Sequence, residues 1–306
     1  MISIRKNTVW LLTGLLLWGC NSKKPGAEPE KESLSKGTIR ISADEAFKPV
    51  IDAQIKVFES EYPKARVIAE YKNEAACLND LNNDSIRMVI VTKGLNREQE
   101  ENFRQNLGYS PAWGRVAWDA VCVIVNNNAP RSQFTVEELT EILEGTSKLP
   151  FRPVFDGLRS TSTVRFAIDS ILRGKPLGKN VTGVQGNEEV INFVEKNPTA
   201  IGFIGLSWIG NPQDPIHKTF LKKVKVAAIK CINCPTSAYE LPFAASIVKG
   251  GYPLVRGLYF ILRERIPGVG GNFAEWMKQQ QGQLIFKRSY LVPAQMNVYA
   301  EDVEIN

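Results

Sequence analysis

The chain has 306 residues, of which 43% are hydrophobic and 23% are charged. These are ordinary globular proportions, and they exclude a mostly disordered, collagen-like or coiled-coil chain. The formal charge of +6, from 38 basic and 32 acidic side chains, is too mild and too scattered to indicate nucleic-acid binding. At about 150 residues per domain, the length predicts two lobes.

The first twenty residues have the layout of an export signal. Two basic residues precede the apolar run Val9–Trp18, which is too short to span a bilayer. Gly19 then precedes Cys20. A small residue before a cysteine resembles the bacterial lipoprotein signal, in which the cysteine becomes the lipidated first residue. We expect residues 1–19 to be removed and Cys20 to carry the lipid; a secretory signal with an incidental cysteine is the alternative.

Residues 20–37 are rich in Pro, Gly, Ser, Lys and Glu. With Leu34 as their only large aliphatic residue, they cannot bury enough apolar surface to order themselves. This composition predicts a flexible tether between the lipid and the folded body.

The first part of the body alternates strands and helices. Thr38–Ser42 alternates in polarity and predicts a strand, and apolar residues from Phe47 to Phe58 recur at helical spacing after Asp44, a typical N-cap. The next strands and helices are expected, in turn, at 66–71, 74–82, 87–92 and 96–105. This β-α-β-α-β-α order predicts an open α/β sheet.

The rest of the chain continues with the same kinds of element. Residues 116–125 form a long apolar, β-rich stretch, which predicts a buried strand. Helices are expected at 136–145, 161–172, 188–197 and 272–290, and strands at 201–204, 223–229 and 257–262.

Four of the five cysteines follow Cys20. Cys77 and Cys122 lie in apolar surroundings and are expected to be buried free thiols. Cys231 and Cys234 form one C-x-x-C pair, and zinc sites usually need a second pair. A small disulfide formed outside the cytosol and two unpaired thiols in a turn are both open.

The residues that common hydrolases need are missing. The one histidine, His217, lies in a stretch expected to be a solvated loop, and there is no G-x-S-x-G, P-loop or H-E-x-x-H motif. We therefore expect no catalytic centre, no metal and no cofactor.

A series of stretches between Gly37 and Pro293 follows an order typical of one family. They read SADEAFKPVIDAQIKVFESEYPKARV, IRMVIVTKGLNREQEE, AWDAVCVIVNNNAPRSQFTVEELTEILEG, LRSTSTVRFAIDSIL, NEEVINFVEKNPTAIGFIGLSWI, GGYPLVRGLYFIL and FAEWMKQQQGQLIFKRSYLVPA. In this order they resemble the substrate-binding proteins of phosphate ABC transporters (PstS-like).

The resemblance implies the type II periplasmic-binding-protein fold, in which two α/β lobes are joined by two crossover strands and clamp the ligand. The lobes would be residues 38–117 plus 247–306, and residues 118–246. The crossings would fall near Ala117–Asp119 and Ala245–Ile247.

The resemblance also places the ligand at loops that follow strands, where free N–H groups at helix N-termini attract anions. The candidate ligand-binding residues come from these loops: Ala46, Phe47, Glu74, Thr92, Lys93, Arg159, Ser160, Thr161, Ser162 and Thr163. The chain departs from the family in having no hydroxyl residue near Ala46. It also carries Glu74 on the second loop, where the family has a Gly/Ser turn, and Thr92–Gly94 where the family has its carboxylate.

Each candidate has a functional and a structural interpretation. Arg159 beside four hydroxyl residues suits bidentate recognition of an oxyanion, although the hydroxyls would equally cap a helix. Glu74 would accept the proton of a protonated oxyanion, or else be a solvated residue of a first helical turn. Asp44 is expected to be a cap, and Arg165 an outward salt-bridge partner.

The sequence thus predicts a monomeric lipoprotein, anchored on the periplasmic side of the cell envelope by its N-terminal lipid. It would bind inorganic phosphate or a similar oxyanion and deliver it to an ABC permease, with no enzymatic activity and no nucleic-acid partner. The alternative is an envelope sensor lipoprotein of the same fold with a different ligand. A hydrolase on this scaffold would need a nucleophile motif that the sequence lacks.

Overall fold

The computed structural model describes residues 32–210, 214–232, 234–235 and 237–295. The expected signal peptide, Cys20 and most of the expected tether lie outside these residues. Residues 32–37, expected to belong to the tether, instead contact the body. Glu32 accepts two hydrogen bonds from the Arg87 guanidinium, at 2.8 and 2.9 Å, and the first strand already begins at Lys36. A charge pair and strand pairing therefore order a segment that has too little apolar surface to order itself.

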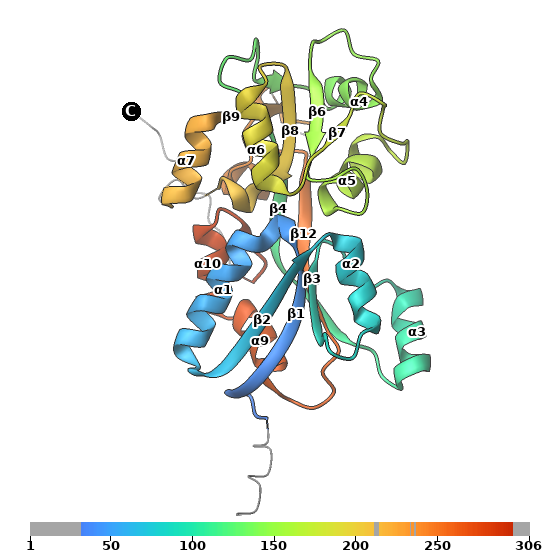
Figure 1. The fold of residues 1–306 in the computed structure, drawn as a ribbon, viewed down its shortest axis with the longest axis vertical. Helices are drawn as coiled ribbons and strands as arrows, with labels where there is room; N and C mark the ends of the chain where they lie inside the picture. The colour runs from blue at the N-terminus through green and yellow to red at the C-terminus, as the bar shows by residue number, and fades with distance from the viewer. Residues whose placement is uncertain (1–31, 211–213, 233, 236, 296–306) are drawn as a thin grey trace, which may run out of the picture. The chain divides into compact units, whose positions relative to one another are not determined.

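One large sheet organises the structure, with the strand order β2-β1-β3-β12-β4-β8-β6-β7 (Figure 1). Its first region holds β1 (Lys36–Asp44), β2 (Lys64–Lys72) and β3 (Met88–Val91), which run parallel, and β12 (Val255–Leu262), which runs antiparallel to β3. The helical segments of this region are η1 (Glu45–Phe47), α1 (Lys48–Glu61), α2 (Glu74–Asn79), η2 (Asp80–Asn82), α3 (Arg97–Leu107), α9 (Val269–Lys278) and α10 (Gln280–Arg288).

The second region holds β6 (Arg152–Phe155) between β7 (Thr182–Gly183) and β8 (Ala200–Gly205), all parallel. The short strands β9 (Val224–Val226) and β13 (Val292–Pro293) both pair with β4. A separate small sheet is formed by β5 (Gln133–Phe134), β10 (Ala228–Lys230) and β11 (Tyr239–Glu240). The helical segments here are α4 (Val136–Glu144), α5 (Ser162–Phe166), the π turn η3 (Ala167–Ile171), α6 (Asn187–Lys196), η4 (Leu206–Trp208), α7 (Pro215–Lys223) and α8 (Ala244–Val248).

The strand β4 (Ala112–Asn126) belongs to both regions. Its residues Ala112–Ala120 pair with β12, and its residues Val121–Val125 pair with β8. In Figure 1 the green β4 and the orange β12 run through the middle, between the helices of the two regions. The first crossing expected near Ala117–Asp119 therefore coincides with this shared strand.

The second crossing lies later than expected. Ala245–Ile247 falls in the helix α8, and the strand that returns to the first region is β12. Ile247, Tyr252 and Leu254 pack into the core of the second region. The alanine-rich segment favours a helix, whereas the β-branched and aromatic residues of VRGLYFIL favour a strand.

His217 is also placed differently from the expectation of a solvated loop. Asp214 caps the helix α7 by accepting the N–H groups of Ile216 and His217, and Pro215 occupies the first helical turn. His217 is buried, and this desolvation lowers its pKa. The expected terminal helix over 272–290 is likewise divided, because the backbone is extended at Gln279 between α9 and α10.

The cysteines resolve the alternatives left open by the sequence. Cys231 and Cys234 form a disulfide with a Cα–Cα distance of 5.6 Å. Cys77 and Cys122 are buried free thiols, as expected. None of the helices in the described ranges is long and apolar enough to cross a membrane.

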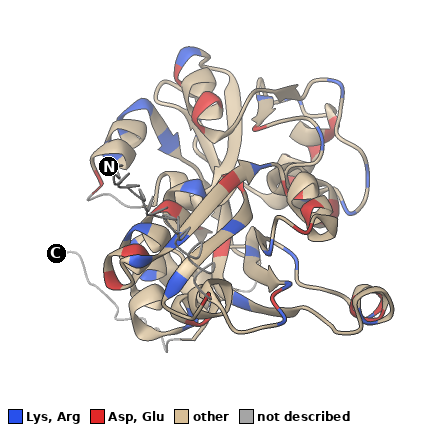
Figure 2. Cartoon of the chain, turned by 60° about the horizontal axis from the view of Figure 1, so that its bottom comes forward, with Lys and Arg blue, Asp and Glu red and all other residues tan. Residues whose placement is uncertain are grey.

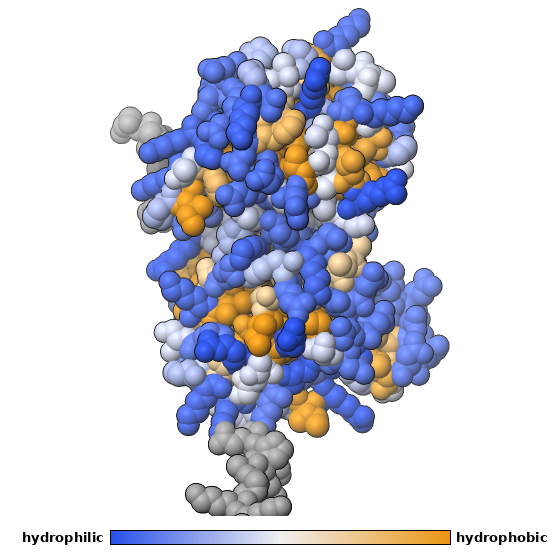
Figure 3. Space-filling model, viewed as in Figure 1, coloured by the Kyte–Doolittle hydropathy of each residue, from blue (hydrophilic) through white to orange (hydrophobic). Residues whose placement is uncertain are grey.

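Charged and apolar side chains are scattered over the surface in Figures 2 and 3 rather than gathered in one place. Basic and acidic side chains are interspersed over the helices and loops in Figure 2. The face in Figure 3 is mostly hydrophilic, and its apolar residues form several separate spots. Exposed apolar residues scattered in this way are normal for a soluble protein and identify no docking face by themselves.

Candidate functional site

The loops that carry the candidate residues meet where the two sheet regions join. The Ser207 hydroxyl of the second region donates to the Ala46 carbonyl of the first at 2.8 Å. The Ala75 N–H donates to the Ser160 carbonyl at 3.1 Å across the same boundary. We call this place the junction. Most of the predicted ligand-binding residues are buried in it, namely Ala46, Phe47, Glu74, Thr92, Thr161, Ser162 and Thr163.

Three of the predicted residues are instead exposed: Lys93, Arg159 and Ser160. Lys93 contacts Asp169 at 3.3 Å. Ser160 has a φ of 71°, a conformation that non-glycine residues rarely adopt, and this turn presents its carbonyl to Ala75. Among the described residues, the Arg159 side chain has neither a hydrogen bond nor an ion pair. The arginine expected to anchor the ligand therefore lies outside the buried cluster.

Asp44 is a cap, as expected. Its Oδ1 accepts the Ala46 N–H at 3.1 Å, so this backbone donor is already engaged. Its Oδ2 is buried and has no hydrogen-bond partner among the described residues. Burial raises the pKa of Asp44 to about 7, and the charge of Arg256 opposes the rise.

Glu74 is buried rather than solvated, which corrects the second interpretation of this residue. Its carboxylate forms an ion pair with Arg165, with 2.5 Å between Nε and Oε2, and accepts the Thr92 N–H at 2.8 Å. Arg165, expected to point outward, thus joins the two regions, and it also contacts Asp169 at 3.2 Å. Burial alone would raise the pKa of Glu74, but the hydrogen bond and charge of Arg165, with Thr92, lower it below its ordinary value.

The hydroxyl residues of the loop after β6 surround another carboxylate, Asp156. Thr161 donates to it at 2.8 Å, and Thr163 forms a very short hydrogen bond with it. Thr161 also accepts the Val164 N–H at 3.3 Å, so the expected helix cap is present. Burial raises the pKa of Asp156, while the two hydroxyl groups act in the opposite direction.

A buried ion pair that the sequence analysis missed lies beside these loops. Arg256 on β12 is the register partner of Asp119 on β4, and its Nε donates to Asp119 Oδ2 at 2.8 Å. Its Nη1 donates to the Ser162 hydroxyl at 2.9 Å, and its Cζ lies 5.0 Å from the centre of the Phe47 ring. The sequence signal for this pair was one charged residue, Asp119, inside the apolar stretch 116–125 and another, Arg256, directly before the apolar strand expected at 257–262.

Asn187, at the start of α6, also connects the regions. Its Nδ2 donates to Glu45 at 2.6 Å and to Asp156 at 3.3 Å, and its Oδ1 accepts the Gly205 N–H at 3.2 Å. The sequence had placed this residue only directly before the helix expected at 188–197. The junction therefore contains three polar clusters, one around Glu74 and Arg165, one around Asp156 and Asn187, and one around Asp119 and Arg256.

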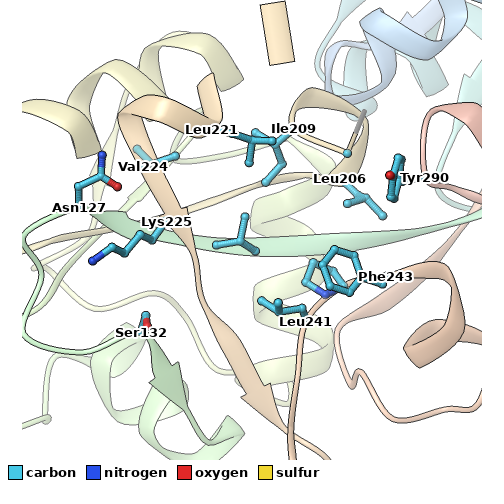
Figure 4. A pocket seen from close by; sticks show the side chains of 13 residues that line it. Asn127, Ser132, Leu206, Ile209, Leu221, Val224, Lys225, Leu241, Phe243 and Tyr290 are labelled. Atoms are coloured by element: carbon cyan, nitrogen blue, oxygen red, sulfur yellow. The ribbon is translucent and has the colours of Figure 1, made fainter. Parts of the chain in front are cut away.

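A cavity of about 610 Å³ lies elsewhere in the second region (Figure 4). Its lining is mostly apolar, with Lys225 as its charged residue: Asn127, Ser132, Leu206, Ile209, Gly210, Leu221, Val224, Lys225, Val226, Leu241, Pro242, Phe243 and Tyr290. This chemistry does not suit an oxyanion, because the lining contains no arginine and few hydroxyl donors.

Two known proteins are similar in sequence to this chain over most of its length. The "Phosphate-binding protein PstS" of Bacillus subtilis is 21% identical over 293 residues, which cover 90% of this chain and 88% of the relative. "Protein SphX" of Synechococcus elongatus is 20% identical over 273 residues, which cover 83% of this chain and 77% of the relative.

Solved structures agree on the fold. A putative phosphate ABC transporter substrate-binding protein with bound phosphate from Clostridium perfringens has a TM-score of 0.68 at 16% identity, covering 84% of this chain and all of that one. An ABC-type phosphate transport receptor from Vibrio cholerae has a TM-score of 0.61 at 17% identity, with the same coverage. The expected fold class, an α/β periplasmic-binding-protein fold, is thereby confirmed.

The family described as "PBP superfamily domain" matches residues 28–280, most of the chain. The chain therefore belongs to the periplasmic-binding-protein superfamily.

Proposed function

We propose that this chain captures inorganic phosphate at the junction and delivers it to an ABC permease. The observation that carries the proposal is the meeting of hydroxyl and guanidinium donors from both regions: Thr92, Ser162 and Arg256, which are buried, and Arg165, which is half-buried. Forked guanidinium groups beside hydroxyls suit the oxygens of an oxyanion. The names of its relatives, one of them a structure with bound phosphate, support the same ligand.

The carboxylates of the junction narrow the choice of oxyanion. Asp44, Glu74 and Asp156 are buried around the same loops. A fully deprotonated anion such as sulfate would set its lone pairs against theirs, whereas hydrogen phosphate carries a proton that a carboxylate accepts. A site that leaves a polar group unpaired with the wrong ligand discriminates strongly against it. We therefore expect phosphate to be preferred over sulfate.

The two sheet regions would act as the two lobes, with β4 and β12 as the connections between them. Each region has its own apolar core. Contacts across the junction, such as the pair Arg165–Glu74, would break as the lobes part and re-form around the ligand. Ligand binding would then shift an equilibrium between open and closed forms.

The cellular setting belongs to the same proposal. Lipidation of Cys20 would hold the protein, as a monomer, on the periplasmic side of the envelope near its permease. The change Cys20→Ser should release the protein into the soluble fraction of lysed cells. A variant that stays in the membrane pellet after cleavage at another position would contradict the lipid anchor.

Calorimetric titration tests the ligand. Protein lacking residues 1–19, unfolded and refolded to strip bound ligand, is titrated with phosphate and separately with sulfate. We expect a single phosphate site and sulfate affinity at least about tenfold lower, as expected when one polar group is left unpaired. Protein that ignores both anions would overturn the phosphate assignment and favour the sensor alternative with a different ligand.

A further inference from the structure

Arg256 is buried but not fully used by the protein. A guanidinium offers five N–H donors in a planar fork. The Nε and Nη1 of Arg256 have partners in Asp119 and Ser162, whereas its Nη2 is buried with no hydrogen-bond partner in the part of the chain that the structure describes. Buried donors of charged groups are nearly always paired in native proteins, so an open one indicates a missing partner.

The unpaired Nη2 lies beside backbone from both regions. A Cβ atom at Gly205 would lie 3.3 Å from this nitrogen and 2.9 Å from the Ala46 carbonyl oxygen. Glycine at position 205 therefore permits β8 to approach η1 at the guanidinium. The open donor thus sits between loops of both regions rather than inside one core.

An open acceptor belongs to the same cluster. The Oδ2 atom of Asp44 is buried without a partner among the described residues, and the charges of Asp44 and Arg256 act on each other. Ser162 contacts the guanidinium, and the Phe47 ring covers it. One small cluster therefore contains a spare cationic donor, a hydroxyl and a spare carboxylate oxygen.

The other arginines near the junction lack this combination. Arg165 is half-buried, and its Nε, Nη1 and Nη2 all donate to Glu74, Thr92 or Asp169. Arg159 is exposed on the strained turn at Ser160. Only Arg256, among these three, offers a buried donor that nothing in the described chain occupies.

We propose that Arg256, rather than Arg159, is the principal cationic anchor of the bound oxyanion, with Asp44 Oδ2 as the acceptor of its proton. This inference rests on the proposed function and names the residues that would carry it. The Nη2 group donates to an unprotonated ligand oxygen. Ser162 either keeps its hydrogen bond with Arg256 or replaces it with one to the ligand. Asp44 selects for an oxyanion that still has a proton to donate.

The test compares phosphate binding by four proteins in calorimetry: wild type, Arg256→Lys, the double variant Asp119→Asn/Arg256→Gln, and Arg159→Ala. The double variant removes both buried charges together, so that neither is left unpaired. Circular dichroism and thermal unfolding establish that each variant is folded. Arg256→Lys keeps the charge but loses the fork, which makes it informative even where the double variant is unstable.

We expect Arg256→Lys to weaken phosphate binding about tenfold and the double variant about 30-fold or more, the usual effect of removing a charge-assisted bond in a closed site. Arg159→Ala should change the affinity less than about threefold, as an exposed charge does. Folded Arg256 variants that bind as wild type does, or a loss confined to Arg159→Ala, would overturn the inference and leave the proposed function intact. Wild-type protein that ignores phosphate would overturn both.

A second variant separates ligand contact from a purely structural role. Asp44→Asn keeps an oxygen for the Ala46 cap but replaces the open acceptor with an amide donor. Titration with phosphate and sulfate should show the preference for phosphate narrowing by about tenfold or more. If Asp44 had only a structural role, the variant would bind phosphate and sulfate more weakly by the same factor. An unchanged preference for phosphate over sulfate would mean that Asp44 does not contact the ligand.

Discussion

The two arginine–carboxylate pairs of the junction join different parts of the molecule. Arg256 and Asp119 lie on neighbouring strands of one sheet, and their side chains are 4% and 0% exposed. Arg165 and Glu74 lie on helices of different regions, and their side chains are 28% and 2% exposed. The first pair would remain together when the regions part, whereas the second would have to separate. The same chemistry therefore serves as a fixed element of the sheet in one place and as a reversible contact in the other.

The largest expected effect comes from breaking the fixed pair. Asp119→Ala leaves the Arg256 charge buried without its ion-pair partner. Removing one partner of such a pair costs about 3–5 kcal/mol. Urea unfolding at pH 7 should show this loss in the free energy of unfolding. A loss below about 1 kcal/mol would mean that water reaches Arg256 and that the pair is not desolvated.

The pH dependence of stability tests the carboxylate next to this pair. Burial raises the pKa of Asp44 from 3.8 to about 7, so the folded protein binds a proton in this interval that the unfolded chain has lost. The contribution of Asp44 to stability therefore falls as the pH rises from about 4 to about 7, by roughly 4 kcal/mol at most.

The variant Asp44→Asn isolates this contribution. Its free energy of unfolding, relative to wild type, should rise between pH 4.5 and pH 7.5, because the amide does not ionise. Wild type and variant are compared by urea unfolding at several pH values in one buffer series. If the free energies of unfolding of wild type and variant changed with pH in parallel, Asp44 would have an ordinary pKa in the folded protein.

The reversible pair should matter less for stability than the fixed one. In Glu74→Gln the amide oxygen can still accept the Thr92 N–H, and Arg165 keeps its contact with Asp169. A hydrogen bond to a charged group contributes about 1.5–3 kcal/mol, so we expect a loss near or below that range in urea unfolding. A loss as large as that of Asp119→Ala would erase the distinction between the two pairs.

The smallest effect is expected for the exposed contact between Lys93 and Asp169. Both side chains are about half exposed, and their charged atoms are 3.3 Å apart. Exposed ion pairs contribute about 0–1 kcal/mol. Lys93→Ala should therefore unfold within about 1 kcal/mol of wild type, and it serves as the control for the other variants. A larger loss would indicate that Lys93 has a further role in the junction.

The order of strands and helices could be predicted because apolar spacing is a local property of the chain. The caps at Asp44 and Thr161 followed from the same kind of local rule. The ion pairs could not be predicted in this way. Arg256 is 137 residues from Asp119, and Arg165 is 91 residues from Glu74.

The identity of the buried arginine illustrates the same limit. Arg159 stands beside four hydroxyl residues in the sequence, which favoured it as the ligand anchor. The turn at Ser160 instead leaves it exposed, and the sheet supplies Arg256 from a strand near the end of the chain. Residue types along one loop indicate which chemistry is available, but only strand pairing decides which side chain reaches the junction.

The strand β4 has a consequence for how the protein unfolds. It pairs with β12 in one region and with β8 in the other, without a loop between the two halves. Melting either core would strip one half of β4 of its partners and leave apolar residues such as Val116 or Val123 in water. The described part of the chain should therefore unfold in one cooperative step, although each region has an apolar core of its own, because neither region can lose its share of β4 alone.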